Sequence, residues 1–577
     1  MATKGRRGRI SSLLQRTGVE VEQIERWFQY VLIAFVLIGT AIPMLILLLQ
    51  AISTGSILRS LTLDIGVGNF VEAIQSSTFQ SAIRNTFIFS LGSVIISHLL
   101  GGTFAFILTR LEVPHSSKFH TMMFLPIFVS PLVLSLGFLF AFSEGGYYHG
   151  LLTGIGITPN ITNVYGMVFI SSIWLTPFSY SFISAGLQNI DPEMEDAARI
   201  TGAADWKVLT NISIPLLKPF LLSSIFICIL LTFQEISIPA ILGLPDRIYV
   251  LSTYLLALQQ QSTPPPYGQL AAVGVLMVII SITIVASISR IIGDVSKYTV
   301  ITGRGRERTI DTPKPVQYGA AAFLAGYLLI FIFVPLFQIL SVGLTEGGNI
   351  AMLKLSALSP EWFMNLWETK SLRRAVKNSL TIALITASLS VVLTGVISYI
   401  SNRVEGITST LLGSIVWIPI ATPGVVLGLA YLWTVLIFNV GLYGTVTVLV
   451  IAFFIRYLAL GVRMNNSLIT QQAEELDEQA KICGAGLFSR LRNVVFPNAK
   501  NGMMSVWVIL FTLFMAELST SIFLYTTSSR VITVTIFELW RTAQYGSLGA
   551  LAITQVLIIF TVVFTMIRLF DIDIRAV

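Results

Sequence analysis

The chain has 577 residues, of which 54% are hydrophobic and 11% charged, and its mean hydropathy is +0.81. Because an ordinary globular domain carries about 25% charged residues, we expect most of this chain to face lipid. This composition excludes a secreted disulfide scaffold, a nucleic-acid binder and a disordered regulator, since none of these carries so much apolar surface in water. The net charge of +7 is therefore read as basic residues in cytoplasmic loops.

The first segment, residues 1–26, is polar and contains six lysines and arginines. It has no short apolar stretch that ends in a small-residue cleavage site, which a signal peptide would need. We expect a cytoplasmic N-terminal arm from which no leader is removed.

Twelve stretches are long and apolar enough to cross a bilayer, which takes about 20 residues as helix. With the N-terminus inside, 25 of the 36 lysines and arginines fall on the cytoplasmic side, as the positive-inside rule requires. The basic outer segment 341–377 departs from the rule, but long loops are translocated largely regardless of charge. The predicted spans are 27–52, 85–109, 122–142, 164–187, 220–242, 270–289, 318–340, 378–400, 411–438, 445–460, 503–523 and 548–567.

An internal repeat divides the chain into two copies of a six-span unit. Asn85-Thr86 through Arg110 corresponds to Asn378-Ser379 through Arg403, and further matches follow at a second constant interval. We predict repeats at 27–289 and 318–567, a cytoplasmic linker at 290–317 and a cytoplasmic tail at 568–577. Parallel repeats are related by an axis along the membrane normal, which predicts a central pathway and transport. The further matches are Gly202 with Gly484, Pro215 with Pro497, Glu235 with Glu517 and Ser237 with Ser519.

The segment between the fourth and fifth spans predicts a cytoplasmic helix-turn-helix. Asp191 offers an N-cap, Pro192 suits the first helical position, and Gly202 predicts a left-handed stop. A second short helix is expected over 205–211, before Pro215 turns the chain into the next span. The second copy should have a weaker cap, because Ala473 replaces the capping aspartate.

These two loops resemble the EAA loop of bacterial type I ABC-importer permeases, E-A-A-x(3)-G-x(9)-I-x-L-P. The carrying segments are DAARITG at 196–202 with ISIP at 212–215, and EQAKICG at 478–484 with VVFP at 494–497. The resemblance implies an all-α type I permease fold of about twelve transmembrane helices, located in the bacterial inner membrane. It also implies that the loops couple to two copies of a separate ABC ATPase subunit through Glu195, Asp196, Ala197, Ala198, Gly202, Pro215, Glu478, Ala480, Gly484 and Pro497.

ATP hydrolysis is expected in the partner chain, because no G-x(4)-G-K-[ST] phosphate loop occurs in this one. We therefore predict no catalytic residue, no metal and no cofactor in this chain, with ATP bound by the partner subunit. The four histidines are scattered without metal-ligand spacing, and Cys228 and Cys483 lie in unlike surroundings, so neither a metal site nor a disulfide is expected.

The last third of each half resembles the ferric-iron branch of these permeases. The carrying residues are 234–245 with Pro266-Tyr267-Gly268, and 517–521 with 536–540. This resemblance implies ferric-iron uptake, with a periplasmic or lipid-anchored substrate-binding protein as a further partner. The fused format is shared with thiamine and some phosphonate permeases, so an importer of thiamine, phosphonate or polyamine remains the alternative.

Glu235 and Glu517 are candidates for the translocation path. Each lies about 15 residues into its predicted span, and an acid at such depth normally faces a cavity or a partner. The other interpretation is that each closes the outer end of its helix, and Arg456, within the tenth span, is the candidate partner of Glu517. The predicted path residues are Glu235, Ser237, Arg456, Glu517 and Ser519.

Three other classes compete with an ABC importer. A proton-coupled secondary carrier can also have two parallel six-span repeats, but it does not need duplicated ordered loops. A membrane enzyme would need a cluster of acids, histidines or a nucleophile with its base, and no such cluster is visible in the sequence. A scaffold or an uncoupled channel leaves the two EAA loops unexplained.

Overall fold

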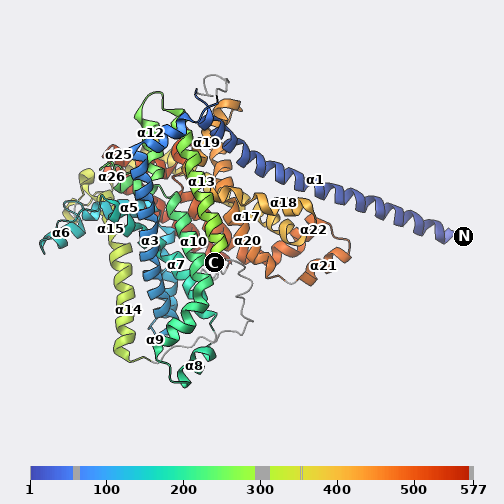
Figure 1. Cartoon of the computed structure of the whole chain (residues 1–577), viewed down its shortest axis with the longest axis horizontal. Helices are drawn as coiled ribbons and strands as arrows, with labels where there is room; N and C mark the ends of the chain where they lie inside the picture. Colours follow the sequence, from blue (N-terminus) through green and yellow to red (C-terminus); the bar gives the residue numbers. More distant parts are fainter. Residues whose placement is uncertain are drawn as a thin grey trace.

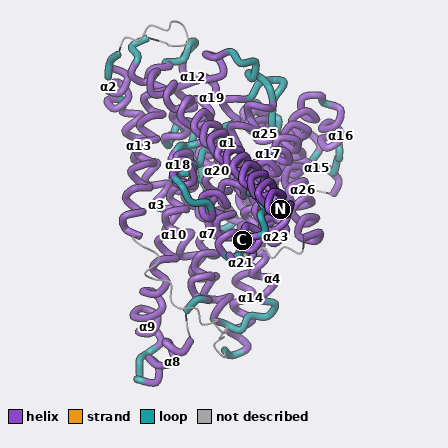
Figure 2. The backbone as a smooth tube through the Cα atoms, turned by 90° about the vertical axis from the view of Figure 1, so that its right-hand side faces the viewer, coloured by secondary structure: helices purple, strands orange, loops and turns teal. Residues whose placement is uncertain are grey.

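Long apolar helices dominate the computed structural model, which describes residues 2–55, 65–190, 192–292, 312–350, 353, 355–472 and 474–570 (Figures 1 and 2). Within these residues the only bridges are two isolated ones, between Ser53 and Ile65 and between Thr345 and Leu358. Among the described residues ten helices could span a membrane, and two bent helix pairs bring the number to twelve if each pair counts as one span. The predicted all-α membrane fold is confirmed. The linker 290–317 and the tail 568–577 lie largely outside the described residues.

The helices that form continuous spans come in pairs of matched length. Those of 34, 25, 21 and 26 residues in the first half recur with the same lengths in the second half, which supports the predicted duplication. They are α3 (Ser77–Arg110) with α17 (Lys370–Arg403), α7 (Val164–Gln188) with α20 (Val446–Thr470), α10 (Ile214–Gln234) with α23 (Phe496–Ala516), and α13 (Tyr267–Ile292) with α26 (Tyr545–Phe570).

The third and ninth predicted spans, 122–142 and 411–438, are bent. Residues 116–128 and 131–153 meet at 93°, and residues 407–421 and 424–438 meet at 105°. Prolines explain both bends, because they remove backbone donors and disfavour helix at the preceding residue. Pro126 and Pro131 flank the first bend, and Pro419 and Pro423 flank the second. The elements are α4 (Ser116–Met122), η1 (Leu125–Phe128), α5 (Pro131–Phe142) and α6 (Tyr147–Thr153), then α18 (Ile407–Ile415), η7 (Ile418–Ala421) and α19 (Gly424–Phe438).

The fifth and eleventh predicted spans are also broken. Helix α10 ends at Gln234 and α23 ends at Ala516, so Glu235 and Glu517 occupy extended C-cap positions rather than helical ones. After each break a short helix and a longer one follow before the last span. They are α11 (Ser237–Leu242) and α12 (Leu251–Gln261), then α24 (Ser521–Leu524) and α25 (Ile532–Arg541).

Three π-helical turns each precede a proline. They are η2 (Leu209–Ser213), η4 (Leu329–Phe333) and η8 (Leu491–Val495), ahead of Pro215, Pro335 and Pro497. A wider turn absorbs the hydrogen bond that proline cannot make and the crowding from its ring. Consequently the second loop helix, α9 (Asp205–Val208), does not end near residue 211 as predicted, but continues through η2 into α10.

The two halves are interlocked by their first helices. Helix α1 (Ala2–Ile52) packs on α18, α19 and α20 of the second half, and α15 (Val334–Leu344), which follows α14 (Lys314–Leu328), packs on α5 of the first. Tyr431 donates to the carbonyl of Gly39 at 2.6 Å across the first contact. In the second, a Cβ on Gly137 would lie 2.6 Å from the Pro335 carbonyl oxygen, so this glycine permits close packing.

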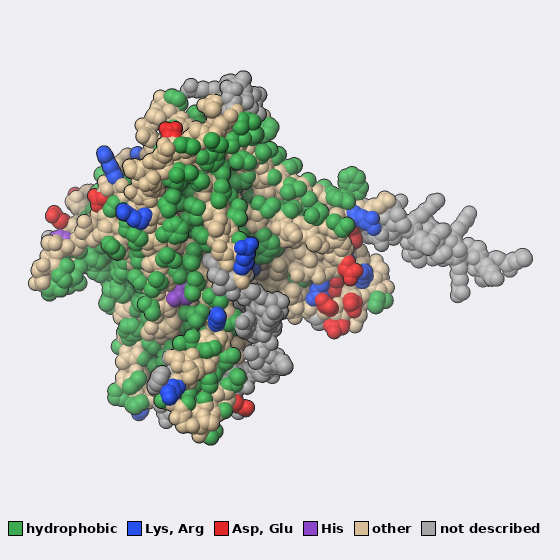
Figure 3. All heavy atoms as spheres, viewed as in Figure 1, with side chains coloured by type: hydrophobic (Ala, Val, Ile, Leu, Met, Phe, Trp, Pro, Cys, Tyr) green, Lys and Arg blue, Asp and Glu red, His purple; other side chains and the backbone are tan. Residues whose placement is uncertain are grey.

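The outer surface shows where lipid and water are expected. Figure 3 shows hydrophobic side chains over much of the visible face, whereas acidic side chains gather near α21 (Glu474–Ile482). Helices α8 (Pro192–Ile200) and α21 lie toward the bottom and right of Figure 1, away from α12 and α25 at the upper left. Two further short helices, α2 (Gly68–Gln75) and α16 (Glu361–Glu368), precede α3 and α17.

Candidate functional site

Each polar loop after the fourth span of a repeat forms a short helix that ends at a left-handed glycine. Gly202 has φ +88° and Gly484 has φ +82°, and the predicted left-handed stop is confirmed. The amide of the next residue donates to the carbonyl five residues back, at 3.1 Å in the first loop and 3.0 Å in the second. The expected capping residue Asp191 and its replacement Ala473 both lie outside the described residues.

A buried ion pair fastens the first loop helix to the membrane domain. Arg110, the last residue of α3, lies 3.0 Å from Glu195 of α8, and each side chain is only 9% exposed. The hydroxyl of Ser213 also donates to Glu195 at 2.9 Å, and Arg110 donates to the carbonyl of Leu187 at 3.4 Å. Glu195 therefore faces the body of the protein and fixes the position of α8.

In the second repeat the loop helix is α21, and different partners attach it to the membrane domain at the equivalent position. Asp477 accepts hydrogen bonds from Tyr399 of α17 at 2.7 and 2.9 Å and lies 3.3 Å from Arg490 of α22 (Leu487–Arg490). Arg403, the counterpart of Arg110, instead pairs at 2.5 Å with Glu474, whose side chain is 70% exposed. Sequence reasoning missed both anchors, because residues far apart along the chain form each of them.

The opposite face of each loop helix carries exposed apolar side chains. Ile200 and Ile482 occupy equivalent positions and are 87% and 85% exposed, and Met194 and Leu476 form a second equivalent exposed pair. The two loop helices therefore share the same pattern of exposed apolar side chains. Among the other predicted coupling residues, Asp196, Ala198 and Ala480 are half-buried, Ala197 and Glu478 are exposed, and Pro215 and Pro497 are the second residues of α10 and α23.

Replacing Arg110 with glutamine is expected to weaken the anchoring of α8 by about 3 kcal/mol, since Glu195 would keep a buried, uncompensated charge. The matched change of Arg403 should cost about 1–2 kcal/mol, because exposed Glu474 can be solvated and the main loss is hydrogen bonding to two backbone carbonyls. Hydrogen exchange of the α8 and α21 amides measures both effects. Equal loss of protection in the two variants would contradict the difference between the anchors.

At the helix breaks, Glu235 and Glu517 each accept hydrogen bonds at both the side-chain carboxylate and the backbone carbonyl. The amide of Ser237 donates to the Glu235 carboxylate at 2.6 Å, and the amide of Thr520 donates to that of Glu517 at 2.9 Å. The backbone carbonyl of each glutamate accepts a hydroxyl, from Ser252 of α12 at 2.7 Å and from a threonine of α25 at 2.8 Å. Each glutamate therefore stabilises the end of its helix as well as lying at a candidate path.

Glu517 also pairs with Arg456, as predicted. The Arg456 Nε atom lies 3.1 Å from Glu517, whose side chain is 3% exposed, and Tyr457 donates to the same carboxylate at 2.6 Å. Gly424 provides the space, since a Cβ there would lie 1.5 Å from Arg456 Nη1. Glu235 is half-buried and lies within electrostatic range of both Glu517 and Arg456. The charged groups of the two repeats therefore meet near the interface between the halves.

The repeated Asn-Thr and Asn-Ser pairs hold the starts of α12 and α25. Asn85 donates to the carbonyl of Tyr249 at 3.0 Å, and the Thr86 hydroxyl accepts the amide of Leu251 at 2.9 Å. Asn378 and Ser379 make the equivalent bonds to Arg530 and Ile532, at 3.0 and 2.8 Å. The repeat was visible in the sequence, but its role in positioning these helices was not.

The His, Cys, Asp and Glu side chains of the described residues are the groups that could bind a metal ion. Within the described ranges, no three His, Cys, Asp or Glu side chains come together as a metal site, and both cysteines are free. Ser237 and Ser519 are buried next to the two breaks.

A family profile described as "Binding-protein-dependent transport system inner membrane component" matches residues 118–294 and 391–575, one segment in each half. The chain belongs to this family. It is therefore a multi-pass transport permease, and its predicted membership of the ABC-importer permeases is confirmed. The match favours this class over a secondary carrier, a membrane enzyme or a scaffold.

Two curated relatives are similar over most of the chain. The ferric transport system permease protein FbpB of Actinobacillus pleuropneumoniae is 26% identical over 88% of this chain and 72% of its own length. The putative ferric transport system permease protein FbpB 1 of Haemophilus influenzae is also 26% identical, over 80% of this chain and 73% of its own. Among solved structures, a bacterial alginate ABC transporter in complex with an alginate pentasaccharide-bound periplasmic protein gives a TM-score of 0.38 and 23% identity, covering 47% of this chain and 96% of the other.

Proposed function

We propose that this permease forms the pathway of a ferric-iron importer. The observation that carries the proposal is its similarity to ferric transport permeases over 88% and 80% of its length. These alignments cover both repeats, so the similarity is not confined to the coupling loops. Thiamine, phosphonate and polyamine are the alternative substrates, and a periplasmic or lipid-anchored binding protein delivers the cargo.

We further propose that two copies of a separate ATPase subunit bind this permease, one on each of the helices α8 and α21. Exposed Ile200 and Ile482, together with exposed Met194 and Leu476 on the same two helices, support docking, because apolar side chains next to water are stabilised when a partner covers them. The buried anchors at Glu195 and Asp477 support transmission of force, since they tie each docking helix rigidly to α3 or α17. ATP is bound by the partners, and this chain carries no cofactor of its own.

The same arrangement supports the orientation that we propose for the chain. The ATPases need ATP from the cytoplasm, so α8, α21 and both termini lie on the cytoplasmic side of the inner membrane. The basic N-terminal arm agrees with the positive-inside rule.

The purified complex is expected to contain one permease chain and two ATPase chains, because the duplication supplies both halves of the pathway. Native mass measurement gives this ratio, and two permeases with two ATPases would contradict it. In liposomes the same complex, with its binding protein, should take up labelled ferric iron, and excess thiamine, phosphonate or spermidine should not compete. If one of these three compounds competed, we would conclude that it, rather than ferric iron, is the substrate.

A further inference from the structure

A cavity of about 860 Å³ lies between the two halves, and its volume is in the range of small-molecule sites. The first half contributes the end of α5, the turn after α11 and the second half of α12. The second half contributes the end of α25 and the start of α26. Aromatic side chains form part of the wall, namely Phe140, Tyr249, Trp540 and Tyr545.

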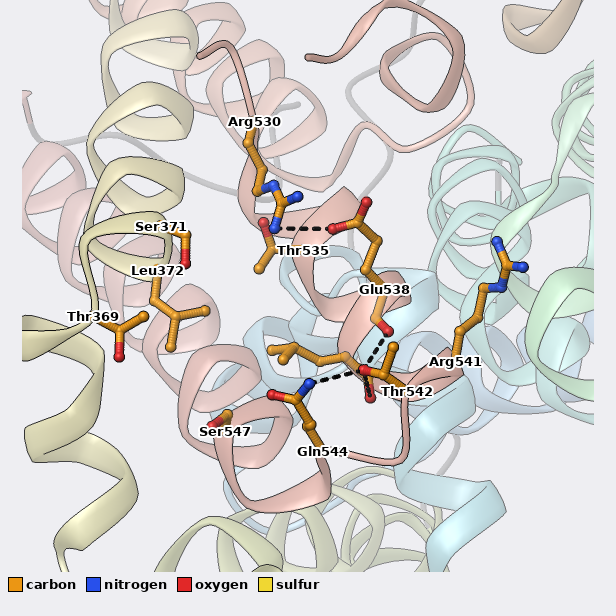
Figure 4. Close-up of a pocket in the computed structure, with 11 residues that line it drawn as sticks. Thr369, Ser371, Leu372, Arg530, Thr535, Glu538, Arg541, Thr542, Gln544 and Ser547 are labelled. Carbon is orange, nitrogen blue, oxygen red and sulfur yellow. Dashed lines mark hydrogen bonds and ion pairs between the residues drawn. The ribbon is translucent and has the colours of Figure 1, made fainter. Parts of the chain in front are cut away.

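The charged lining residues of this cavity are two arginines, Arg247 and Arg541, and no carboxylate is among its lining side chains. Both arginines are exposed, and in the part of the chain that the structure describes neither guanidinium makes an ion pair or a hydrogen bond. Glu538 is close in sequence but is engaged elsewhere, by Arg530 at 3.0 Å and by Tyr525 at 2.7 Å. Arg541 also lines the neighbouring cavity of about 540 Å³ together with Glu538, and Figure 4 shows Glu538 paired with Arg530 while Arg541 stands apart from both.

Arg247 is held in a backbone conformation that favours glycine. Its φ is +55°, and the next amide, of Ile248, donates to the carbonyl of Gly243 at 2.8 Å, which closes the helix end in a left-handed turn. A non-glycine residue in this conformation costs about 1–2 kcal/mol. Strained residues concentrate at functional sites, which makes Arg247 a candidate for a functional role.

Helices α12 and α25 connect this cavity with the breaks at the two glutamates. The Ser252 and Thr533 hydroxyls bond to the carbonyls of Glu235 and Glu517, and Gln260 and Arg541 each follow eight residues later. Eight residues of α-helix span about 12 Å. The cavity lined by Arg247 and Arg541 therefore lies at the C-terminal ends of α12 and α25, whereas the two glutamates lie at the N-terminal ends of these helices.

We propose that this cavity binds an oxyanion, a small carboxylate- or phosphate-bearing molecule. Guanidinium groups bind carboxylate and phosphate through paired hydrogen bonds, and two free arginines facing one chamber would repel a bare trivalent cation. If iron is the cargo, as the proposed function holds, it then enters this permease within an anionic ligand shell. A free oxyanion and the shell of a chelated metal share the same chemistry, and the test separates them.

The test measures equilibrium binding to the full-length permease in lipid nanodiscs, without ATPase or binding protein. The probes are labelled citrate, labelled inorganic phosphate and ferric citrate. We expect saturable binding of at least one probe, and Arg247→Gly and Arg541→Gln should each weaken it about tenfold. Arg541→Lys keeps the charge but loses the paired donors, so it should weaken binding less than Arg541→Gln does. Arg373→Gln, which removes an exposed arginine outside the cavity, should bind as the unaltered protein does.

Arg247→Gly separates a ligand role from a structural one. Glycine relieves the strain at φ +55°, so the melting temperature should stay the same or rise while binding falls. Binding of citrate or phosphate alone assigns the cavity to a free oxyanion, and binding only of ferric citrate assigns it to the ligand shell of the metal. No saturable binding of any probe, or unchanged binding in both arginine variants, would overturn the proposal. Because no transport is measured, this result is independent of whether the complex imports iron.

Discussion

Replacing Glu517 with glutamine is expected to lower the free energy of unfolding by about 3 kcal/mol, because Arg456 would lose its counterion in a buried site. Glutamine keeps the size of the side chain, so the loss reports charge rather than packing. The single amide oxygen of glutamine can accept from only one of the two present donors, Tyr457 or the amide of Thr520, so the loss includes one hydrogen bond as well as the ion pair. Thermal unfolding of the purified permease in detergent measures the change.

Glu235→Gln is the matched control, since this carboxylate is half-buried and its hydrogen bond comes from an amide rather than from a cation. We expect a much smaller change in melting temperature. Replacing Arg456 with methionine together with Glu517→Gln should recover most of the lost stability, because no charge is then left unpaired. An equal effect of Glu235→Gln and Glu517→Gln would contradict a specific pair with Arg456.

The same variants test the translocation path. If both glutamates attract the cargo, the double Gln variant should reduce iron uptake by more than the sum of the single changes. Unchanged uptake, with reduced stability only for Glu517→Gln, would leave Glu517 a structural residue and remove the two carboxylates from the path.

Gly202→Glu is expected to abolish substrate-stimulated ATP hydrolysis while the permease accumulates normally in the membrane. A Cβ at Gly202 meets nothing within 4 Å, so the substitution creates no internal clash, but at φ +88° it costs about 1–2 kcal/mol in the left-handed conformation. The added carboxylate lies beside exposed Ile200, on the surface proposed to meet the ATPase. ATPase activity of the reconstituted complex measures coupling, and quantitative blotting measures abundance.

Gly484→Glu should act in the same way, with a different severity, because the two loops are anchored by different residues. Asparagine tolerates the left-handed conformation, so Gly202→Asn and Gly484→Asn serve as controls and should retain coupling. Persistent transport in both glutamate variants would mean that the loops are ordinary turns.

The membrane class, the duplication and the position of the two EAA-like loops could be predicted from the sequence. Apolar runs of sufficient length predict spans, because the bilayer requires about 20 residues of helix. Gly202 and Gly484 predicted the loop ends, because a left-handed stop favours glycine so strongly that one residue carries the signal. The pair of Arg456 with Glu517 was also predictable, since buried charges in a membrane require partners.

The breaks in the spans and the contacts that hold the loops became visible only in the folded chain. Hydropathy does not distinguish a straight helix from a bent one, because a break that is buried in protein keeps its apolar composition. The acids Glu195 and Asp477 illustrate the second limit: their local sequence places both in a polar loop, yet Arg110 and Tyr399 from distant helices turn them inward. Such partners are selected by packing, which brings together residues that no local pattern connects.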